Sequence, residues 1–217
     1  MTLALLIIIA VAFTFVAWRA ADRLGTDAPL QLLSMLNMVL ITLFGGVLFS
    51  WADYSTNCGN VWYADVMLTQ WLVMRRFGWR NGLRAAASTF VGLLMLLLIT
   101  AVLQTQLSDS PLDTAYGMVI DASRDFTVAS FMAFWLGQGV LITIYRACDA
   151  RPLWLCYGVA IAAAQAVDSA VFFPIAFSSF DISLLHAAAA GFVVKVGLGL
   201  LAIPALARIG VPRGSKP

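Results

Sequence analysis

Residues 83–103 read LRAAASTFVGLLMLLLITAVL, and this stretch decides which fold class the chain can adopt. Its segment Leu93–Val102 is apolar almost throughout and does not alternate between apolar and polar residues, as a strand of a membrane β-barrel would. A helix of about 20 mostly apolar residues is long enough to cross the ~30 Å hydrocarbon core of a bilayer. Residues 83–103 are therefore predicted to form a transmembrane helix.

The composition of the whole chain indicates the same class. Of its 217 residues, 62% are hydrophobic and only 11% are charged, and the mean hydropathy is +0.91. Soluble domains average about 45–50% apolar and about 25% charged residues, so an ordinary soluble domain is excluded. The net charge of +2 is too small to indicate a nucleic-acid surface, and no nucleic-acid partner is expected.

Six further stretches on either side of residues 83–103 are apolar and approximately long enough to cross a bilayer. The sequence therefore predicts an all-α polytopic membrane protein with a single transmembrane domain over residues 1–217. The third stretch is short and polar, so a bundle of six spans is the alternative to seven. The seven predicted spans are 2–18, 30–51, 60–75, 83–103, 126–147, 153–178 and 183–207.

The basic residues test this count, because cytoplasmic loops of membrane proteins carry an excess of Lys and Arg. With seven spans, eleven basic residues fall on one side of the membrane, Arg124 falls on the other, and Lys195 lies within a span. The alternation would fail if a span were missing or invented, so it favours seven. It places the N-terminus outside and the C-terminus in the cytoplasm.

The longest segment between predicted spans, residues 104–125, contains a helix-start signal. Ser110 precedes Pro111, and an acid follows at Asp113. Serine at the N-cap, proline at the first helical position and an acid in the first turn are typical of a helix N-terminus. We predict a short interfacial helix over residues 111–118 on the outer face.

Two ionisable residues fall deep inside predicted spans. Asp168 lies about two-thirds along the sixth span, and Lys195 lies near the middle of the seventh. Charged groups near the bilayer centre are costly and by default indicate a functional site. The two helices run antiparallel, and a lysine side chain can cover much of the resulting depth difference of about 10 Å, at a rise of 1.5 Å per residue. A buried ion pair that only fixes helix packing is the alternative, and the two interpretations are compatible.

Glycines surround Lys195 on its own helix. Gly191 and Gly199 lie four residues before and after it, and Gly197 lies between. Small residues allow close helix packing, and they also leave space for a ligand to reach an ammonium group. The sequence alone does not separate these two roles.

Amide and aromatic side chains recur at helical spacing on three of the predicted spans. Each stripe mixes polar with planar groups, and lipid requires neither, so each stripe is either core packing or the lining of an internal site. The stripes comprise Gln165, Asp168 and Phe172; Arg124, Val128, Phe131, Trp135 and Gln138; and Asn60, Tyr63, Met67 and Gln70.

A carboxylate, amides and aromatic rings in a dry cavity suit a flat, polar, largely uncharged heterocycle. A guanine-type ring presents an N–H and an amino group side by side to one carboxylate, and stacking on an aromatic ring contributes ~1–3 kcal/mol per base. An analogue without these groups would leave buried polar atoms unpaired and be rejected. The expected binding set is Asp168, Gln165, Lys195 and Gln138, with Trp135 or Phe172 as the stacking platform and Arg124, Phe131, Asn60 and Tyr63 as further candidates.

Sequence patterns typical of enzymes are weak in this chain. His186 is the only histidine and the three cysteines are scattered, so neither a metal cluster nor a disulfide framework is expected. The chain contains no GxxxxGK[ST] phosphate loop and no GxSxG nucleophile motif. We therefore expect no catalytic residues and no cofactor. A membrane enzyme that uses His186 with a serine, and a purely structural subunit, are the less favoured alternatives.

Residues of the C-terminal half form a recognisable pattern: Arg124, Ala129-Ser130, Ala133 and Gln138 in one span, Trp154, Gln165-x-x-Asp168 and Phe172 in the next, and Lys195 and Pro204 near the end. This pattern resembles that of the VUT family of queuosine-precursor transporters. The similarity is good over residues 104–206 and looser over 30–90, where the family's acidic residues of the second and third spans are reduced to Asp65.

This resemblance implies a function that agrees with the ligand chemistry argued from the residues. It implies a multi-pass protein of the cell inner membrane that takes up 7-cyano-7-deazaguanine or 7-aminomethyl-7-deazaguanine. A substrate-binding subunit that needs a separate ATPase partner is a second form of the same hypothesis. The sequence is also compatible with a homodimer.

Overall fold

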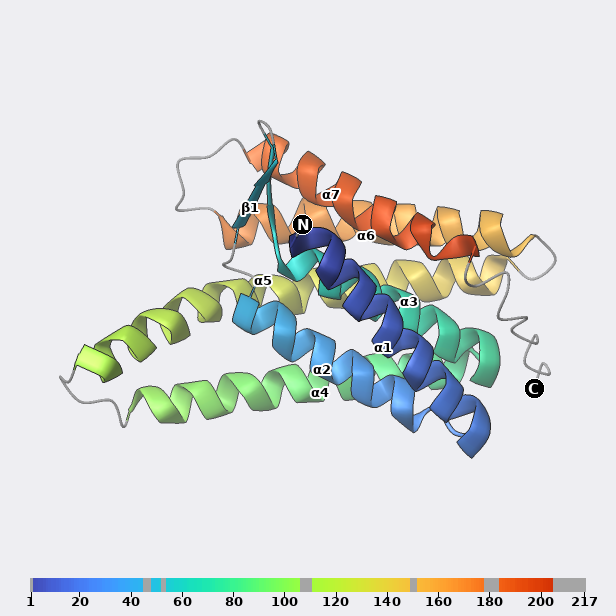
Figure 1. Ribbon diagram of the computed structural model, residues 1–217, viewed down its shortest axis with the longest axis horizontal. Coiled ribbons are helices and arrows are strands. Elements are labelled where there is room, and N and C mark those ends of the chain that lie inside the picture. The colour runs from blue at the N-terminus through green and yellow to red at the C-terminus, as the bar shows by residue number, and fades with distance from the viewer. Residues whose placement is uncertain are drawn as a thin grey trace.

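The computed structural model describes residues 2–44, 48–51, 54–105, 111–148, 152–177 and 184–204. Over these ranges the chain forms seven helices and one two-stranded hairpin, and the helices pack as a bundle (Figure 1). The fold class predicted from the sequence, an all-α helical-bundle membrane protein, is confirmed. The elements are α1 (Thr2–Leu24), α2 (Ala28–Phe44), β1 (Leu48–Trp51), β2 (Tyr54–Asn57), α3 (Gly59–Phe77), α4 (Trp79–Gln104), α5 (Pro111–Ala147), α6 (Leu153–Ala176) and α7 (Leu184–Leu201).

Helix α3 is the centre of the bundle. Every residue from Gly59 to Met74 is buried, because α1, α2, α4, α5 and α7 all pack against this helix. Its polar side chains are therefore shielded from lipid by other helices, which explains how the most polar of the predicted spans forms a stable helix. The helix that the sequence left in doubt is the one around which the others are arranged.

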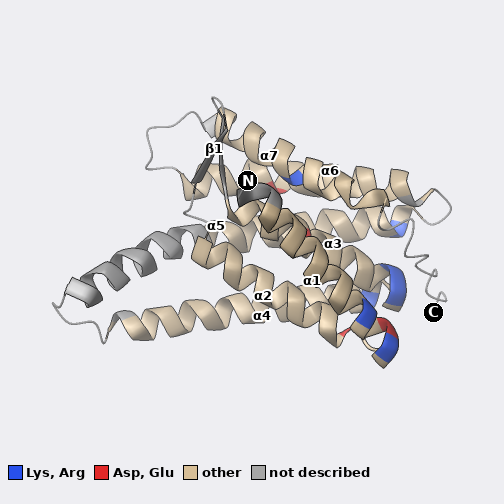
Figure 2. Cartoon of the chain, in the orientation of Figure 1, with Lys and Arg blue, Asp and Glu red and all other residues tan. Residues whose placement is uncertain are grey.

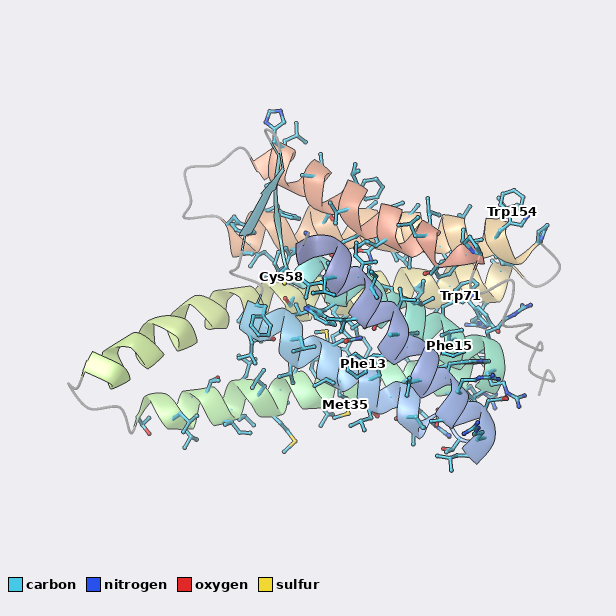
Figure 3. The ribbon with its side chains drawn as sticks, in the orientation of Figure 1. Phe13, Phe15, Met35, Cys58, Trp71 and Trp154 are labelled. Carbon is cyan, nitrogen blue, oxygen red and sulfur yellow. The ribbon has the colours of Figure 1, made fainter. Side chains whose placement is uncertain are left out.

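The outer surface of the bundle is apolar, as a bilayer requires. Phe13 on α1 is 52% exposed and Trp154 on α6 is 59% exposed, whereas Trp71 on α3 is 1% exposed (Figure 3). Within the described ranges, α1, α4, α5 and α6 are long and apolar enough to cross a membrane, while α2 and α7 are shorter apolar helices. The count of seven spans stays a prediction.

The second predicted span ends earlier than expected. The second span was predicted to reach residue 51, but α2 ends at Phe44 and β1 begins at Leu48. Gly45 and Gly46 follow Phe44 in the sequence, and glycine disfavours helix by about 1 kcal/mol relative to alanine. Strands β1 and β2 then pair antiparallel, with Leu48 opposite Asn57, and the sequence analysis did not anticipate this hairpin.

The short helix predicted over residues 111–118 is not a separate element. Helix α5 begins at Pro111, as the helix-start signal indicated, and continues without a break to Ala147. Residues 119–125 contain neither glycine nor proline, so nothing in the backbone ends the helix before the predicted fifth span.

Basic side chains gather at one end of the bundle, where α1 ends and α3 meets α4 (Figure 2). There Arg76 pairs with Asp22 at 3.2 Å, and the Arg146 guanidinium lies 4.6 Å from the centre of the Trp79 ring. Such a cluster is typical of a cytoplasmic face. It agrees with the orientation predicted from the sequence.

A single residue, Gly78, joins α3 to α4. Its backbone has φ +91° and ψ 160°, a region open essentially to glycine alone. A Cβ atom added there would meet nothing within 4 Å, so any cost of a side chain would come from the backbone. We expect Gly78→Ala to lower the free energy of unfolding by on the order of 1 kcal/mol or more.

Thermal unfolding of the purified protein in detergent measures this effect. Gly139→Ala is the matched control, because Gly139 is inside α5 and its added Cβ also meets nothing within 4 Å. Equal melting temperatures for the two variants would contradict the expectation.

Candidate binding site inside the bundle

The structure joins the two ionisable residues that the sequence placed in neighbouring spans. Lys195 Nζ on α7 donates a hydrogen bond to Asp168 Oδ2 on α6. The lysine side chain is 3% exposed and the aspartate side chain 2% exposed. The pair is thus fully enclosed by the protein. In such a site the attraction between opposite charges is strong, but each ion has lost its hydration.

Aromatic rings surround the ammonium group of this pair. Lys195 Nζ lies 4.8 Å from the ring centre of Tyr63, 5.5 Å from that of Phe172 and 5.8 Å from that of Phe173. All three distances fall within the ~6 Å range of cation–π attraction. The pair therefore lies against planar faces from α3 and α6.

Gln165 lies one helical turn before Asp168 on α6 and is 0% exposed. Among the described residues, neither Gln165 Nε2 nor Gln165 Oε1 has a hydrogen-bond partner. Leaving a buried polar group unpaired costs about 1–3 kcal/mol. A donor and an acceptor beside the ion pair are thus available to a guest molecule.

Helix α5 brings a second amide to the same region. Gln138 is 1% exposed, and its Nε2 lies 3.3 Å from the sulfur of Met67, which is a weak acceptor. A Cβ atom added at the adjacent Gly137 would lie 3.4 Å from the Tyr63 hydroxyl and 3.4 Å from the carbonyl oxygen of Ala164. Helices α3, α5 and α6 therefore meet closely at this point.

The remaining predicted residues are placed differently. Asn60 is buried on α3 near α7, where its Nδ2 would lie 3.5 Å from a Cβ added at Gly191. The ring of Phe131 lies 4.4 Å from that of Phe90 on α4, and the ring of Trp135 lies 5.3 Å from it. The contacts described for these two rings therefore join α5 to α4 rather than to the ion pair. The side chain of Arg124 lies outside the described residues.

A second buried carboxylate, Asp65, was not proposed as a site residue from the sequence. Thr14 Oγ1 donates a hydrogen bond to its Oδ1, and Asn37 Nδ2 donates to its Oδ2 at 2.7 Å. At about 100° per residue, Asp65 lies roughly 160° around α3 from Tyr63. Helix α3 thus presents one polar face to the ion pair and places a separate carboxylate on the opposite face. An acid inside an apolar span was the signal that could have found it.

The fold and the enclosed ion pair together define a polytopic helical membrane protein with a cluster of polar side chains inside the bundle. A family model described as "Putative vitamin uptake transporter" matches residues 57–209. The chain therefore belongs to this family of membrane transporters, as the sequence resemblance predicted. The matched range contains α3 to α7, the helices that carry the ion pair and both amides. No curated protein and no solved structure matches the chain significantly.

Proposed function

We propose that this protein imports a queuosine precursor, 7-cyano- or 7-aminomethyl-7-deazaguanine, across the cell inner membrane. The observation that carries the proposal is Gln165, a fully buried amide with no partner in the described part of the chain. It lies one turn from a carboxylate that is itself enclosed. A heterocycle with adjacent donors and a ring carbonyl would use both groups.

The geometry suggests how such a base would be held. Asp168 would accept hydrogen bonds from the ring N–H and the exocyclic amino group, and Gln165 Nε2 would donate to the ring carbonyl. Tyr63 and Phe172, whose rings already lie within 6 Å of Lys195 Nζ, would replace Trp135 as the stacking platform. Lys195 would stay hydrogen-bonded to Asp168 Oδ2 and hold the carboxylate in place for the base.

Replacing Gln165 by leucine separates binding from folding. Because the amide has no described partner, its loss is expected to leave the melting temperature unchanged or raise it. Uptake of labelled deazaguanine at low concentration is expected to fall about tenfold or more, which corresponds to one or two lost hydrogen bonds. Uptake by cells that lack their own precursor synthesis measures this effect.

Val159→Leu is the matched control for this experiment, because Val159 lies on the same helix and is 49% exposed to lipid. It is expected to transport normally. Undiminished uptake by a well-expressed Gln165→Leu protein would remove the amide from the mechanism and with it the main support for this site.

The alternative form of the proposal is a binding subunit that depends on a separate ATPase. Purified protein in liposomes distinguishes the two, because a self-sufficient transporter accumulates or equilibrates the labelled base without any partner. Binding without transport in the same liposomes would favour the subunit.

A further inference from the structure

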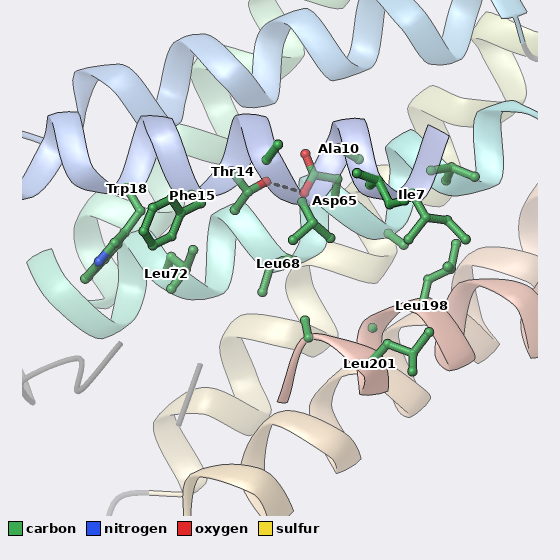
Figure 4. A pocket seen from close by; sticks show the side chains of 17 residues that line it. Ile7, Ala10, Thr14, Phe15, Trp18, Asp65, Leu68, Leu72, Leu198 and Leu201 are labelled. Atoms are coloured by element: carbon green, nitrogen blue, oxygen red, sulfur yellow. Dashed lines mark hydrogen bonds between the residues drawn. The ribbon is translucent and has the colours of Figure 1, made fainter. Parts of the chain in front are cut away.

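A cavity lies on the face of α3 away from the ion pair. It has a volume of about 500 Å³ and is lined by α1, α3 and α7 (Figure 4). Its lining is apolar except for Thr14 and Asp65. Small-molecule sites typically have volumes of ~300–1,000 Å³, apolar walls and a few polar groups, so this cavity has the size and character of a ligand site.

The cavity reaches the outer surface of the bundle. Its lining residues Ile8 and Phe15 on α1 are 64% and 48% exposed, and Leu201 on α7 is 70% exposed. In a membrane protein this surface faces lipid chains. A ligand would therefore enter from the bilayer and need an apolar body.

Asp65 is the only ionisable group among the residues described as lining the cavity. Its carboxylate is positioned by hydrogen bonds from Thr14 and Asn37, and each oxygen keeps a lone pair for another donor. Over the described ranges, no Lys or Arg lies within salt-bridge distance of Asp65, in contrast to Asp168. A buried carboxylate without a cation is costly when ionised.

We propose that this cavity binds an amphipathic organic cation, a protonated amine on an apolar body, with Asp65 as its counter-ion. The ammonium group donates to the free lone pairs of Asp65. Trp18 and Phe15 cover the apolar body together with the aliphatic side chains of α7. An anion would be repelled, and a neutral polar molecule would leave its own groups unpaired against these walls.

Among the described residues, no cation competes for Asp65. Asn37 from α2 and Thr14 from α1 face Asp65 and do not titrate. Tyr157 from α6 is the titratable group in electrostatic contact with it.

The other charged residues on the helices around Asp65 either have different partners or belong to the basic cluster where α1 ends and α3 meets α4. Lys195 of α7 pairs with Asp168, and the Arg19 guanidinium on α1 lies 5.5 Å from the ring centre of Phe15. Asp22 pairs with Arg76. The remaining arginines lie near the ends of α1, α3 and α5 and at the start of α4: Arg23, Arg75, Arg146, Arg80 and Arg84.

Equilibrium binding to the full chain in lipid nanodiscs tests the proposal. The probes are 1-naphthylmethylamine and its neutral isostere 1-naphthalenemethanol, each corrected for partition into empty nanodiscs. We expect the amine to bind at least tenfold more tightly than the alcohol. In Asp65→Asn the difference between the two probes is expected to disappear.

A second variant keeps the test decisive if Asp65→Asn folds poorly. Leu198→Trp fills the cavity from α7 and is expected to weaken binding of both probes, while Phe13→Trp, outside the lining, leaves binding unchanged. Equal binding of amine and alcohol to the unmodified protein overturns the proposal, and so does a preference for the amine that survives in Asp65→Asn. Neither probe is a deazaguanine, so such a failure leaves the proposed transport function standing.

Discussion

Replacing Lys195 by methionine is expected to lower the free energy of unfolding by about 3–5 kcal/mol and to abolish uptake, the largest effect expected for this protein. The variant leaves Asp168 as an enclosed carboxylate without its cation. Three aromatic rings that now face an ammonium group would face a thioether chain instead. Thermal unfolding and uptake of labelled deazaguanine measure the two effects.

Val193→Met is the matched control, since it introduces the same side chain two residues earlier on α7 at a position that is 65% exposed. It is expected to melt and transport like the unmodified protein. A Lys195→Met protein as stable as this control would show that the ion pair contributes little to folding.

A double variant separates packing from binding. Asp168→Leu combined with Lys195→Met removes both charges, and replacing a buried pair by apolar residues of similar size is often neutral or stabilising by about 1–4 kcal/mol. The melting temperature is therefore expected to recover, whereas uptake is not, because the base has lost its carboxylate. Recovery of transport together with stability would assign the pair to helix packing alone.

The sequence predicted the contacts that depend on depth in the membrane. Asp168 and Lys195 lie on consecutive antiparallel helices, so the helical rise alone placed them within reach of each other. Gln165 followed from its spacing to Asp168 on the same helix face. These inferences need only the order of the helices and their periodicity.

The rotation of each helix about its own axis could not be predicted in the same way. The stripe on α5 contains Gln138 together with Phe131 and Trp135. One buried face of a helix can contact two neighbouring helices, so residues of one stripe can meet different partners. Gln138 contacts Met67 of α3, while the two rings contact Phe90 of α4. The periodicity identifies a buried face and leaves open which neighbour each residue meets.

Asp65 shows a different limit of the same approach. A search for one polar face assumes that the opposite face meets lipid, and α3 is buried on every side from Gly59 to Met74. A helix at the centre of a bundle is buried on more than one face, so the search that found the stripe with Tyr63 did not consider Asp65 on the opposite face. The number and the length of the predicted helices do not reveal which helix is central.

Gly191→Val is expected to have the second largest effect, because it acts on stability and on the site together. A Cβ atom at Gly191 would lie 2.5 Å from Cζ and 2.6 Å from Cε2 of Phe173. Phe173 is buried, and its ring lies 5.8 Å from Lys195 Nζ, so a shift of this ring or of α7 disturbs the aromatic surroundings of the ammonium group. We expect the free energy of unfolding to fall by up to about 3 kcal/mol, as in other overpacked cores, and uptake to fall with it.

Gly197→Val on the same helix separates this effect from the general cost of valine in a helix. A Cβ at Gly197 meets nothing within 4 Å, so the substitution carries the same propensity change without the contact with Phe173. Its melting temperature and uptake are expected to stay close to those of the unmodified protein. The comparison also decides between the two roles that the sequence left open for the glycines around Lys195. If Gly191→Val destabilises the protein and Gly197→Val does not, the close approach of α7 to α6 explains the glycine at position 191. Equal losses of stability in both variants would show that α7 needs its glycines for a reason other than the contact with Phe173.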